Sequence, residues 1–151
     1  MTEAPSESKS LAGRTALVTG GCGGLGQATA RRLKRDGATV IISDLDATQG
    51  QSMADELGVQ FLAQDVSDVT AWQAAAEQIT AEHGALDILV NNAAILRADN
   101  IESETLEQFQ RVMAVNCESV FLGIQHCLPL MTRPGAAGPK ALQWRSFHPR
   151  R

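Results

Sequence analysis

Between residues 13 and 84, short apolar runs alternate with longer segments of helical periodicity. Such alternation is typical of βαβ units, in which helices cover both faces of a parallel sheet. Four nearly all-apolar runs are the expected strands: Thr15–Thr19, Thr39–Ser43, Val59–Ala63 and Leu86–Asn91. With 151 residues, 44% of them hydrophobic, the chain suits one domain of this kind.

Helical segments fill the gaps between these strands. Three are expected there: Gly24–Arg35, a helix capped by Asp46, and a helix that opens at Ser67 or Asp68 and stops at Gly84. After the fourth strand we expect a loop over residues 92–102. Thr105 to Met131 then predicts one long helix or two abutting ones, with Pro129 and Pro134 marking its end.

A glycine-rich turn lies between the first strand and the first helix. Gly20, Gly24 and Gly26 form a GxxxGxG pattern, and Gly21 and Gly23 loosen the turn further. A diphosphate at a helix N-terminus meets unpaired N–H groups and the positive end of the helix dipole, and glycine lets it approach the backbone. The position of the turn favours a diphosphate site over a turn without a ligand. No Lys-Ser or Lys-Thr follows, which excludes a nucleoside-triphosphate P-loop.

A carboxylate ends the second strand. Asp44 lies 18 residues after Gly26, where dinucleotide-binding folds place an acceptor for the adenosine ribose hydroxyls. Its charge would repel a 2′-phosphate, and residues 20–26 contain no Lys or Arg, so NAD is favoured over NADP. The alternative is that Asp44 only caps the next helix, although Asp46 is better placed for that.

These features, with three more in order and spacing, resemble the short-chain dehydrogenase/reductase family over roughly residues 11 to 132. The matching motifs are Thr19-Gly-x-x-x-Gly-x-Gly26, Asp44, Asp65-Val66, Asn91-Asn-Ala-Ala94 and Asn116. Ala94 replaces the family's more usual glycine. The resemblance implies an α/β fold, a Rossmann-type doubly wound parallel sheet with strand order 3-2-1-4, truncated after the fourth strand and the following long helix.

The resemblance also implies an NAD-dependent oxidoreductase that moves hydride between NAD and a small alcohol or carbonyl substrate. In that likeness Asp65 and Val66 lie against the adenine, Asn92 to Ala94 line the ribose and nicotinamide side, and Asn91 braces the sheet. Asn116 belongs to the catalytic set, where it holds a water in a proton relay. The implied cofactor-binding residues are Gly20, Cys22, Gly23, Gly24, Leu25, Gly26, Asp44, Leu45, Asp65, Val66, Asn92, Ala93 and Ala94.

The family's catalytic Ser, Tyr and Lys have no match in this chain. It contains no Tyr, and the only Lys beyond Lys34 is Lys140. Acid–base and electrostatic groups each contribute rate factors of roughly 10² to 10⁴, so little turnover is expected. A non-catalytic dinucleotide-binding or interaction module therefore stays open as the alternative. A methyltransferase is a third possible function, and the Asn91–Ala94 run argues against it.

The two ends of the chain differ from the domain between them. Residues 1–10 are polar and expected to be disordered, and residues 133–151 form an aperiodic basic tail that holds three of the five prolines. In a shifted reading frame, codons for the tail can encode an apolar strand followed by Ser-Ser, as the family has there. We hypothesise that a frameshift or misjoined exon replaced the C-terminal half from Lys140 onward. A genuine short protein with a disordered tail is the alternative.

Charge narrows the range of partners. Residues 133–151 hold five of the 13 Lys and Arg residues and no acid, so residues 1–132 carry eight bases against 17 acids, a net charge of −9. Such a body repels phosphate backbones, and nucleic acid is not expected to bind. With neither a long apolar run nor a signal peptide, the chain is expected to be cytoplasmic and to have no membrane partner. The resemblance implies that family members form homo-oligomers, but this chain is not expected to form one.

Cysteine and histidine give no sign of a disulfide framework or a metal site. Cys22, Cys117 and Cys127 are odd in number and lie in or beside apolar segments. The three histidines are scattered and lack the spacing of metal ligands. We therefore expect free thiols and no bound metal.

Overall fold

A computed structural model of the chain describes residues 10–97 and 100–132. In this part, four parallel strands form one sheet in the order β3-β2-β1-β4, which confirms the predicted fold class and strand order. The strands are β1 (Thr15–Thr19), β2 (Thr39–Asp44), β3 (Gln60–Ala63) and β4 (Ile88–Val90). The helices are α1 (Gly24–Arg35), α2 (Ala47–Leu57), α3 (Val69–His83), α4 (Leu106–Met113), the π-helical η1 (Ala114–Glu118) and α5 (Ser119–Met131). The predictions for residues 1–9 and for the tail at 133–151 lie outside the described residues.

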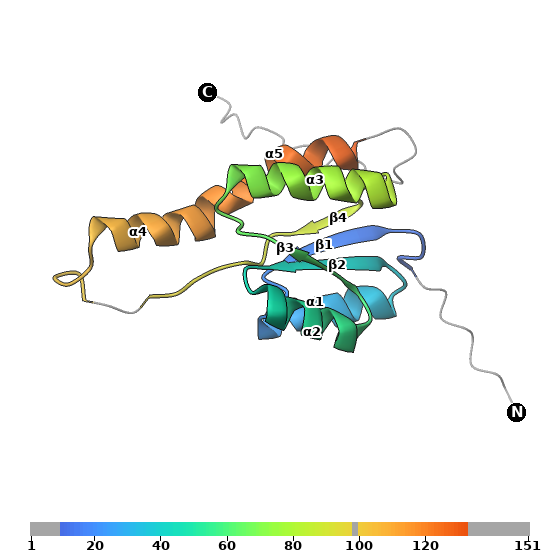
Figure 1. Ribbon diagram of the computed structural model, residues 1–151, viewed down its shortest axis with the longest axis horizontal. Coiled ribbons are helices and arrows are strands. Elements are labelled where there is room, and N and C mark those ends of the chain that lie inside the picture. Colours follow the sequence, from blue (N-terminus) through green and yellow to red (C-terminus); the bar gives the residue numbers. More distant parts are fainter. Residues whose placement is uncertain (1–9, 98–99, 133–151) are drawn as a thin grey trace, which may run out of the picture.

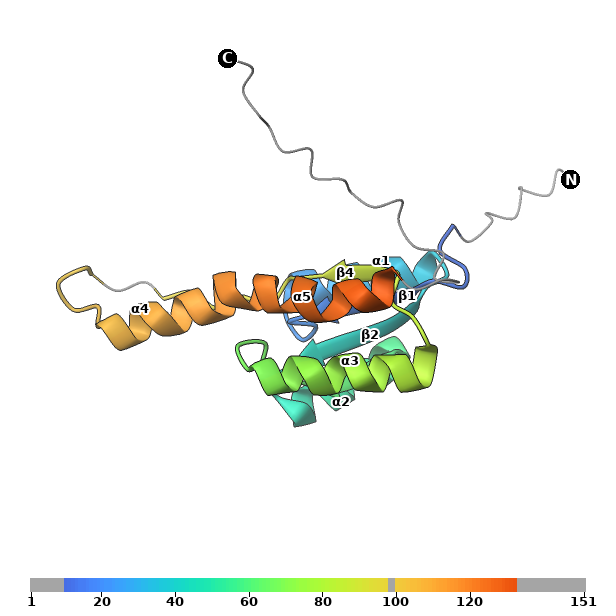
Figure 2. The ribbon, with the colours of Figure 1, turned by 90° about the horizontal axis from the view of Figure 1, so that it is seen from above.

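The helices cover both faces of the sheet (Figures 1 and 2). On one face α1 and α2 pack against Val18 and Ile42, and on the other α3 and α5 pack against Leu17 and Ile41. Successive strand residues therefore point into two different cores, as the pleat requires. This arrangement explains why the central strands read as continuous apolar runs rather than alternating ones.

Three strands differ in length from the prediction. β2 is one residue longer and ends at Asp44 rather than Ser43. β3 begins at Gln60 rather than Val59, because the Val59 N–H donates to the Ala54 carbonyl (2.9 Å) and completes the end of α2. β4 covers only Ile88–Val90, because it pairs with β1 alone in the described part of the chain. The edge position leaves β4 half-buried, whereas β1 is buried throughout.

Side chains cap the helices as their sequence positions predict. Asp46 accepts hydrogen bonds from the N–H groups of Thr48 and Gln49 (both 2.9 Å), and this confirms it as the cap of α2. Of the two candidates at the start of α3, Asp68 is the cap, accepting from the Thr70 N–H (2.8 Å). Each cap satisfies backbone donors that the first turn of a helix leaves unpaired.

The long helical segment after the fourth strand is interrupted by η1. α4 and α5 abut through this π-helical turn, which agrees with the second of the two predicted arrangements. α5 ends at Met131, as predicted, and Pro129 lies inside its last turn. Because proline has no N–H, Pro129 cannot donate to the Gln125 carbonyl one turn before it. Pro134 lies outside the described residues.

Candidate functional site

A cleft of about 370 Å³ opens beyond the carboxyl ends of the strands. Parallel α/β sheets bind their ligands at this edge, where the strand order reverses. The cleft brings together every predicted cofactor residue except Cys22. Its lining residues are Gly20, Gly23, Gly24, Leu25, Gly26, Asp44, Leu45, Gln64, Asp65, Val66, Asn92, Ala93, Ala94, Ile95, Arg111 and Val115. Segments from four different loops and from the α4–η1 region therefore meet at one site.

The glycines of the turn meet two different requirements. Gly20 has φ of +65°, and a Cβ there would lie 2.8 Å from the Ala93 Cα. At Gly26 a Cβ would lie 2.2 Å from the Gly20 carbonyl oxygen, so the backbone itself excludes any larger residue. Gly24 has open space around the same position. Gly20 and Gly26 are thus needed for packing of the turn, whereas Gly24 keeps the start of α1 accessible from the cleft.

Asp44 joins the end of β2 to the glycine-rich turn. Its Oδ2 accepts from the Cys22 N–H (2.9 Å) and its Oδ1 from the Leu45 N–H (2.8 Å). The cap of α2 is Asp46, so Asp44 is not required for that purpose. A carboxylate oxygen can accept more than one hydrogen bond, so both oxygens keep capacity for ligand hydroxyls.

Cys22 belongs to the turn but does not line the cleft. Its carbonyl accepts from Gln27 Nε2 (2.8 Å), and its N–H is bound to Asp44. Burial, assisted by the nearby Asp44 carboxylate, raises the pKa of the Cys22 thiol to about 11. The thiol is therefore protonated at neutral pH and is not an activated nucleophile.

Thr19 and Asn92 tie the turn after β1 to the segment after β4. Thr19 Oγ1 accepts from the N–H groups of Asn92 and Ala93 (both 3.1 Å). Asn92 Nδ2 donates in return to the carbonyls of Thr19 (2.9 Å) and Gly20 (3.1 Å). These reciprocal bonds hold the predicted ribose side of the cleft, Asn92 to Ala94, against the glycine-rich turn.

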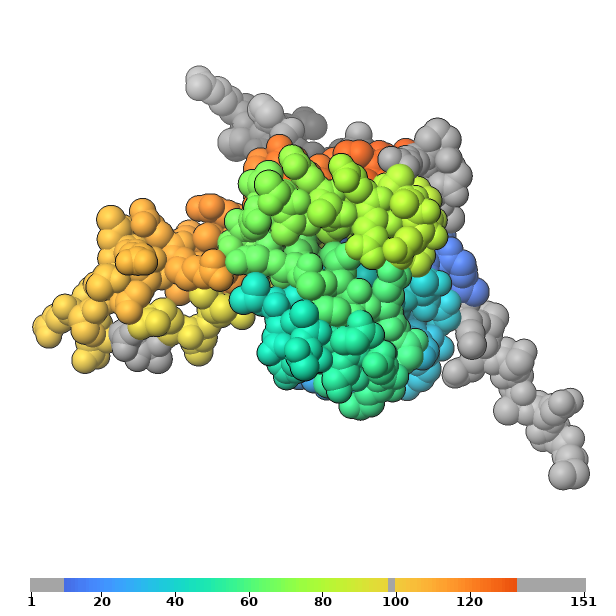
Figure 3. Space-filling model, in the orientation of Figure 1, coloured from blue at the N-terminus to red at the C-terminus, as the bar shows by residue number. Residues whose placement is uncertain are grey.

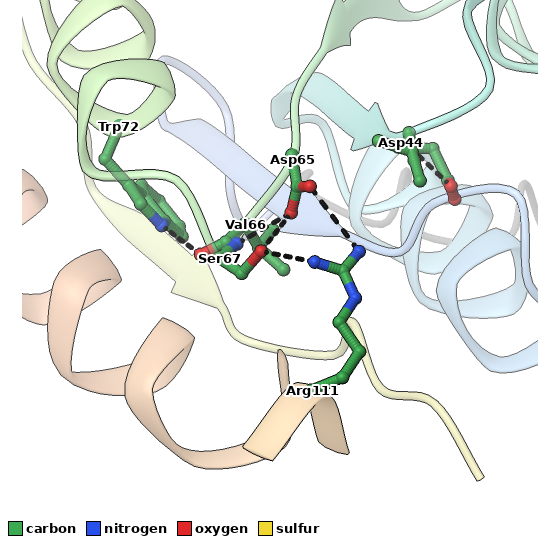
Figure 4. A network of polar contacts seen from close by, with 7 residues as sticks. Asp44, Asp65, Val66, Ser67, Trp72 and Arg111 are labelled. Atoms are coloured by element: carbon green, nitrogen blue, oxygen red, sulfur yellow. Dashed lines mark hydrogen bonds and ion pairs between the residues drawn. The ribbon is translucent and has the colours of Figure 1, made fainter. Parts of the chain in front are cut away.

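The segment after β3 is held by bonds from three sides (Figure 4). Asp65 Oδ1 accepts from the Ser67 N–H (2.9 Å) and Oγ (2.6 Å), and Trp72 Nε1 donates to the Val66 carbonyl (2.8 Å). Arg111 approaches Asp65 Oδ2 at 3.5 Å. Burial raises the pKa of the Asp65 carboxyl, but the Ser67 hydrogen bonds and the Arg111 charge outweigh it and hold the pKa below its ordinary value. Asp65 is therefore ionised at neutral pH.

Asn116 lies in η1, outside the cleft lining. Its Nδ2 donates to the Ile95 carbonyl and its Oδ1 accepts from the Ile95 N–H, both at 2.8 Å. The side chain therefore pairs with the backbone of the loop after β4 as a neighbouring strand would. π-Helical turns recur at functional sites. The predicted role of Asn116 in a proton relay stays a prediction.

Four lining residues were absent from the sequence prediction: Gln64, Ile95, Arg111 and Val115. Gln64 and Ile95 directly extend the predicted motifs at Asp65 and Ala94. Arg111 lies 46 positions after Asp65, and no local pattern connects the two. The signal that could have found Arg111 is its position five residues before Asn116, in the same predicted helical segment.

Two kinds of feature are absent from the described residues. In residues 10–97 and 100–132, no group of three or more His, Cys, Asp and Glu side chains is arranged to hold a metal ion. Within the same residues, no helix has the length and apolar character needed to cross a bilayer.

Comparison with known proteins agrees with this geometry. The family model described as short chain dehydrogenase matches residues 14–138. Over 129 residues the chain is 39% identical to a 3-beta-hydroxysteroid dehydrogenase of Comamonas testosteroni, covering 84% of this chain and 51% of that protein. It is 35% identical to a 2,5-dichloro-2,5-cyclohexadiene-1,4-diol dehydrogenase of Sphingobium indicum, with 83% and 52% covered.

A 3-alpha-(or 20-beta)-hydroxysteroid dehydrogenase of Mycobacterium tuberculosis is 36% identical over 127 residues, covering 83% of this chain and 49% of that protein. The chain thus spans about half the length of the curated relatives it matches. Since the family model covers most of the chain and includes every strand of the sheet, this protein belongs to the short-chain dehydrogenase family.

Proposed function

We propose that this chain forms the cofactor-binding part of an NAD-dependent oxidoreductase, which moves hydride between NAD and an alcohol or carbonyl substrate. Membership of the family implies a nicotinamide dinucleotide cofactor and a small-molecule substrate. The observation that carries the proposal is the cleft itself. It combines a helix N-terminus, a carboxylate at the end of β2 and the Asp65–Val66 segment in one cavity.

The start of α1 suits the diphosphate of such a cofactor. Gly23, the N-cap of α1, provides no side-chain cap, and the first turn contains no acidic residue. The N–H groups at a helix start lack intrahelical partners, so those of Gly24 and Leu25 are available donors. Backbone donors and the helix dipole would together bind a doubly charged diphosphate here.

The charges of the cleft favour NAD over NADP. Asp44 is placed to accept from the ribose hydroxyls and would repel a 2′-phosphate. Among the described lining residues, Arg111 is the one Lys or Arg, and it is already paired with Asp65. A phosphate group on the ribose would therefore lack a free cationic partner in this cleft.

The chemical step requires groups that this chain lacks. A bound nicotinamide supplies or accepts the hydride, and the family adds a Tyr and a Lys for proton transfer. Of the family's catalytic set, this chain matches Asn116 alone, since the Ser, the Tyr and the Lys have no match in it. We therefore propose binding without efficient turnover by this chain alone. The relatives' names describe dehydrogenases of hydroxysteroids and a cyclic diol, which favours a secondary alcohol as the substrate class.

A second candidate is a non-catalytic dinucleotide-binding module, which would use the same cleft. A fluorescence titration with NADH and NADPH, with S-adenosylmethionine as a competitor, tests the binding shared by both candidates. NADH is expected to bind more tightly than NADPH, and S-adenosylmethionine is not expected to compete. Assays of NAD reduction with secondary alcohols then separate the candidates. A folded protein that binds neither dinucleotide would contradict both.

A further inference from the structure

Arg111 connects a projecting helix to the segment after β3. α4 stands away from the body of the molecule (Figures 1 and 3), and none of its residues is buried. Arg111 reaches back from this helix, with Nη1 donating to Ser67 Oγ (3.0 Å) and Nη2 at 3.5 Å from Asp65 Oδ2. One guanidinium thus contacts both Asp65, which lines the cleft, and Ser67, two residues further along the chain (Figure 4).

The two oxygens of Asp65 have different surroundings. Ser67 supplies two donors to Oδ1, whereas Arg111 is the neighbour of Oδ2. The Asp65 side chain keeps 33% of its surface exposed and lines the cleft. Its carboxylate is therefore held in one orientation while remaining open to a further hydrogen-bond donor.

We propose that Arg111 is a positioning residue for adenine recognition, because it fixes the Asp65 carboxylate where that group can accept from the exocyclic amine of the base. This inference rests on the proposed function, in which Asp65 and Val66 lie against the adenine. Arg111 itself need not touch the cofactor. It acts through Asp65 and, by the same contacts, sets the distance between α4 and the cleft.

The chemistry of the base decides which ligand this arrangement selects. Adenine carries an amine at C6, which donates to a carboxylate, whereas hypoxanthine carries a carbonyl oxygen there, which a carboxylate repels. The planar guanidinium can donate to Ser67 and Asp65 together, and a lysine ammonium cannot reproduce that fork. Arg111→Lys should therefore keep the positive charge but fix the orientation of the Asp65 carboxylate only in part.

The test compares NADH with its hypoxanthine counterpart by fluorescence titration. For the wild-type chain we expect NADH to bind roughly tenfold more tightly, as for a hydrogen bond to a charged group. In Arg111→Met the affinity for NADH should fall by about tenfold, and the preference for NADH should shrink to about twofold or less. Arg111→Lys should lie between these values. The matched control is Arg35→Met, which removes an equal charge from an exposed position of α1; it should keep the wild-type preference.

The preference between the two bases separates positioning from a general effect of charge or folding. If Arg111→Met folds and keeps the full preference for NADH, Arg111 has no role in adenine recognition and the inference is wrong. Should that variant fail to fold by circular dichroism, Ser67→Ala and Arg111→Lys replace it. An unchanged preference in both would overturn the inference. A wild-type chain that binds neither dinucleotide overturns the proposed function, and this inference with it.

Discussion

The two flanks of the sheet are packed to different degrees. On the side of β1, β2 and α1, β1 is buried throughout and β2 is buried over Val40 to Ser43. On the side of β4 and α5, the edge strand is half-buried and large apolar side chains are exposed. Those of α4 and α5 are Leu106, Phe109, Met113, Phe121, Ile124 and Leu128, with 38 to 70% of their surface exposed. Monomeric soluble proteins rarely expose so many apolar side chains together.

The geometry explains this difference. α5 lies on the same face of the sheet as α3, and the carbonyl of Leu130 near its end accepts from the N–H of Leu86, just before β4 (3.5 Å). A right-handed crossover through α5 would place a following parallel strand beyond β4. The cleft is lined from both flanks, but none of the exposed apolar side chains of α4 and α5 is among its lining residues. Binding and complete packing can therefore be tested separately.

The largest expected contrast comes from the same Ile→Ser substitution in α3 and in α5, which cover the same face of the sheet. Ile79 of α3 is 1% exposed and Ile124 of α5 is 51% exposed. Ile79→Ser should lower the free energy of unfolding by about 4 kcal/mol, since it leaves a cavity and a buried hydroxyl. Ile124→Ser should change it by less than about 0.5 kcal/mol and raise solubility. Urea unfolding measures both, and equal losses would show that the α5 face is covered in solution.

Within the well-packed flank, Gly26 and Gly24 form a second contrast. Gly26→Ala should cost about 3 kcal/mol of unfolding free energy, because the new methyl group meets the Gly20 carbonyl. Gly24→Ala should stay within about 0.5 kcal/mol, because nothing lies within 4 Å of the added atom. Thermal and urea unfolding report the difference. Equal stability of the two variants would contradict the packing described for the turn.

Substitutions of Asp44 and Asp46 distinguish a role in cofactor binding from a role in helix capping. Asp44→Ala should weaken NAD binding by about 1 to 3 kcal/mol and narrow the preference over NADP. Asp46→Ala removes the cap of α2 and should cost about 1 kcal/mol of stability, with NAD affinity unchanged. Calorimetric titration of both folded variants provides the measurement. Unchanged NAD affinity in Asp44→Ala would mean that this carboxylate serves only the backbone of the turn.

Substitution of Asn116 is expected to have the smallest effect. Asn116→Ala removes both side-chain bonds to Ile95 and should cost about 1 kcal/mol or less, because the residue is exposed. Hydrogen exchange at the Ile95 amide should become several times faster, whereas exchange at Leu17 in β1 should not change. Unchanged exchange at Ile95 would show that the loop after β4 is held by other contacts.

Features encoded locally were predictable from the sequence. The glycine-rich turn, the carboxylate at the end of β2 and the caps Asp46 and Asp68 each depend on a few neighbouring residues. The contact of Arg111 with Asp65 was not predictable, since it depends on how α4 is placed in three dimensions. The π-helical turn at Ala114–Glu118 has no local signature either, and the short β4 reflects its edge position. Local chemistry thus predicted the glycine-rich turn and Asp44, whereas Asp65, Val66 and Asn92 to Ala94 were predicted through the family resemblance. Tertiary placement added Arg111 to the cleft.

Chemical-shift mapping with ADP-ribose tests most directly whether the cleft binds the dinucleotide. In the ¹⁵N-labelled chain, saturable shifts are expected at the amides of Gly24 and Leu25 at the start of α1, of Leu45 after β2 and of Val66 after β3. Amides on the exposed side of α5, such as that of Ile124, should not move. A folded chain whose cleft amides stay unchanged at saturating ligand, or whose shifts lie on α5 instead, would contradict the account.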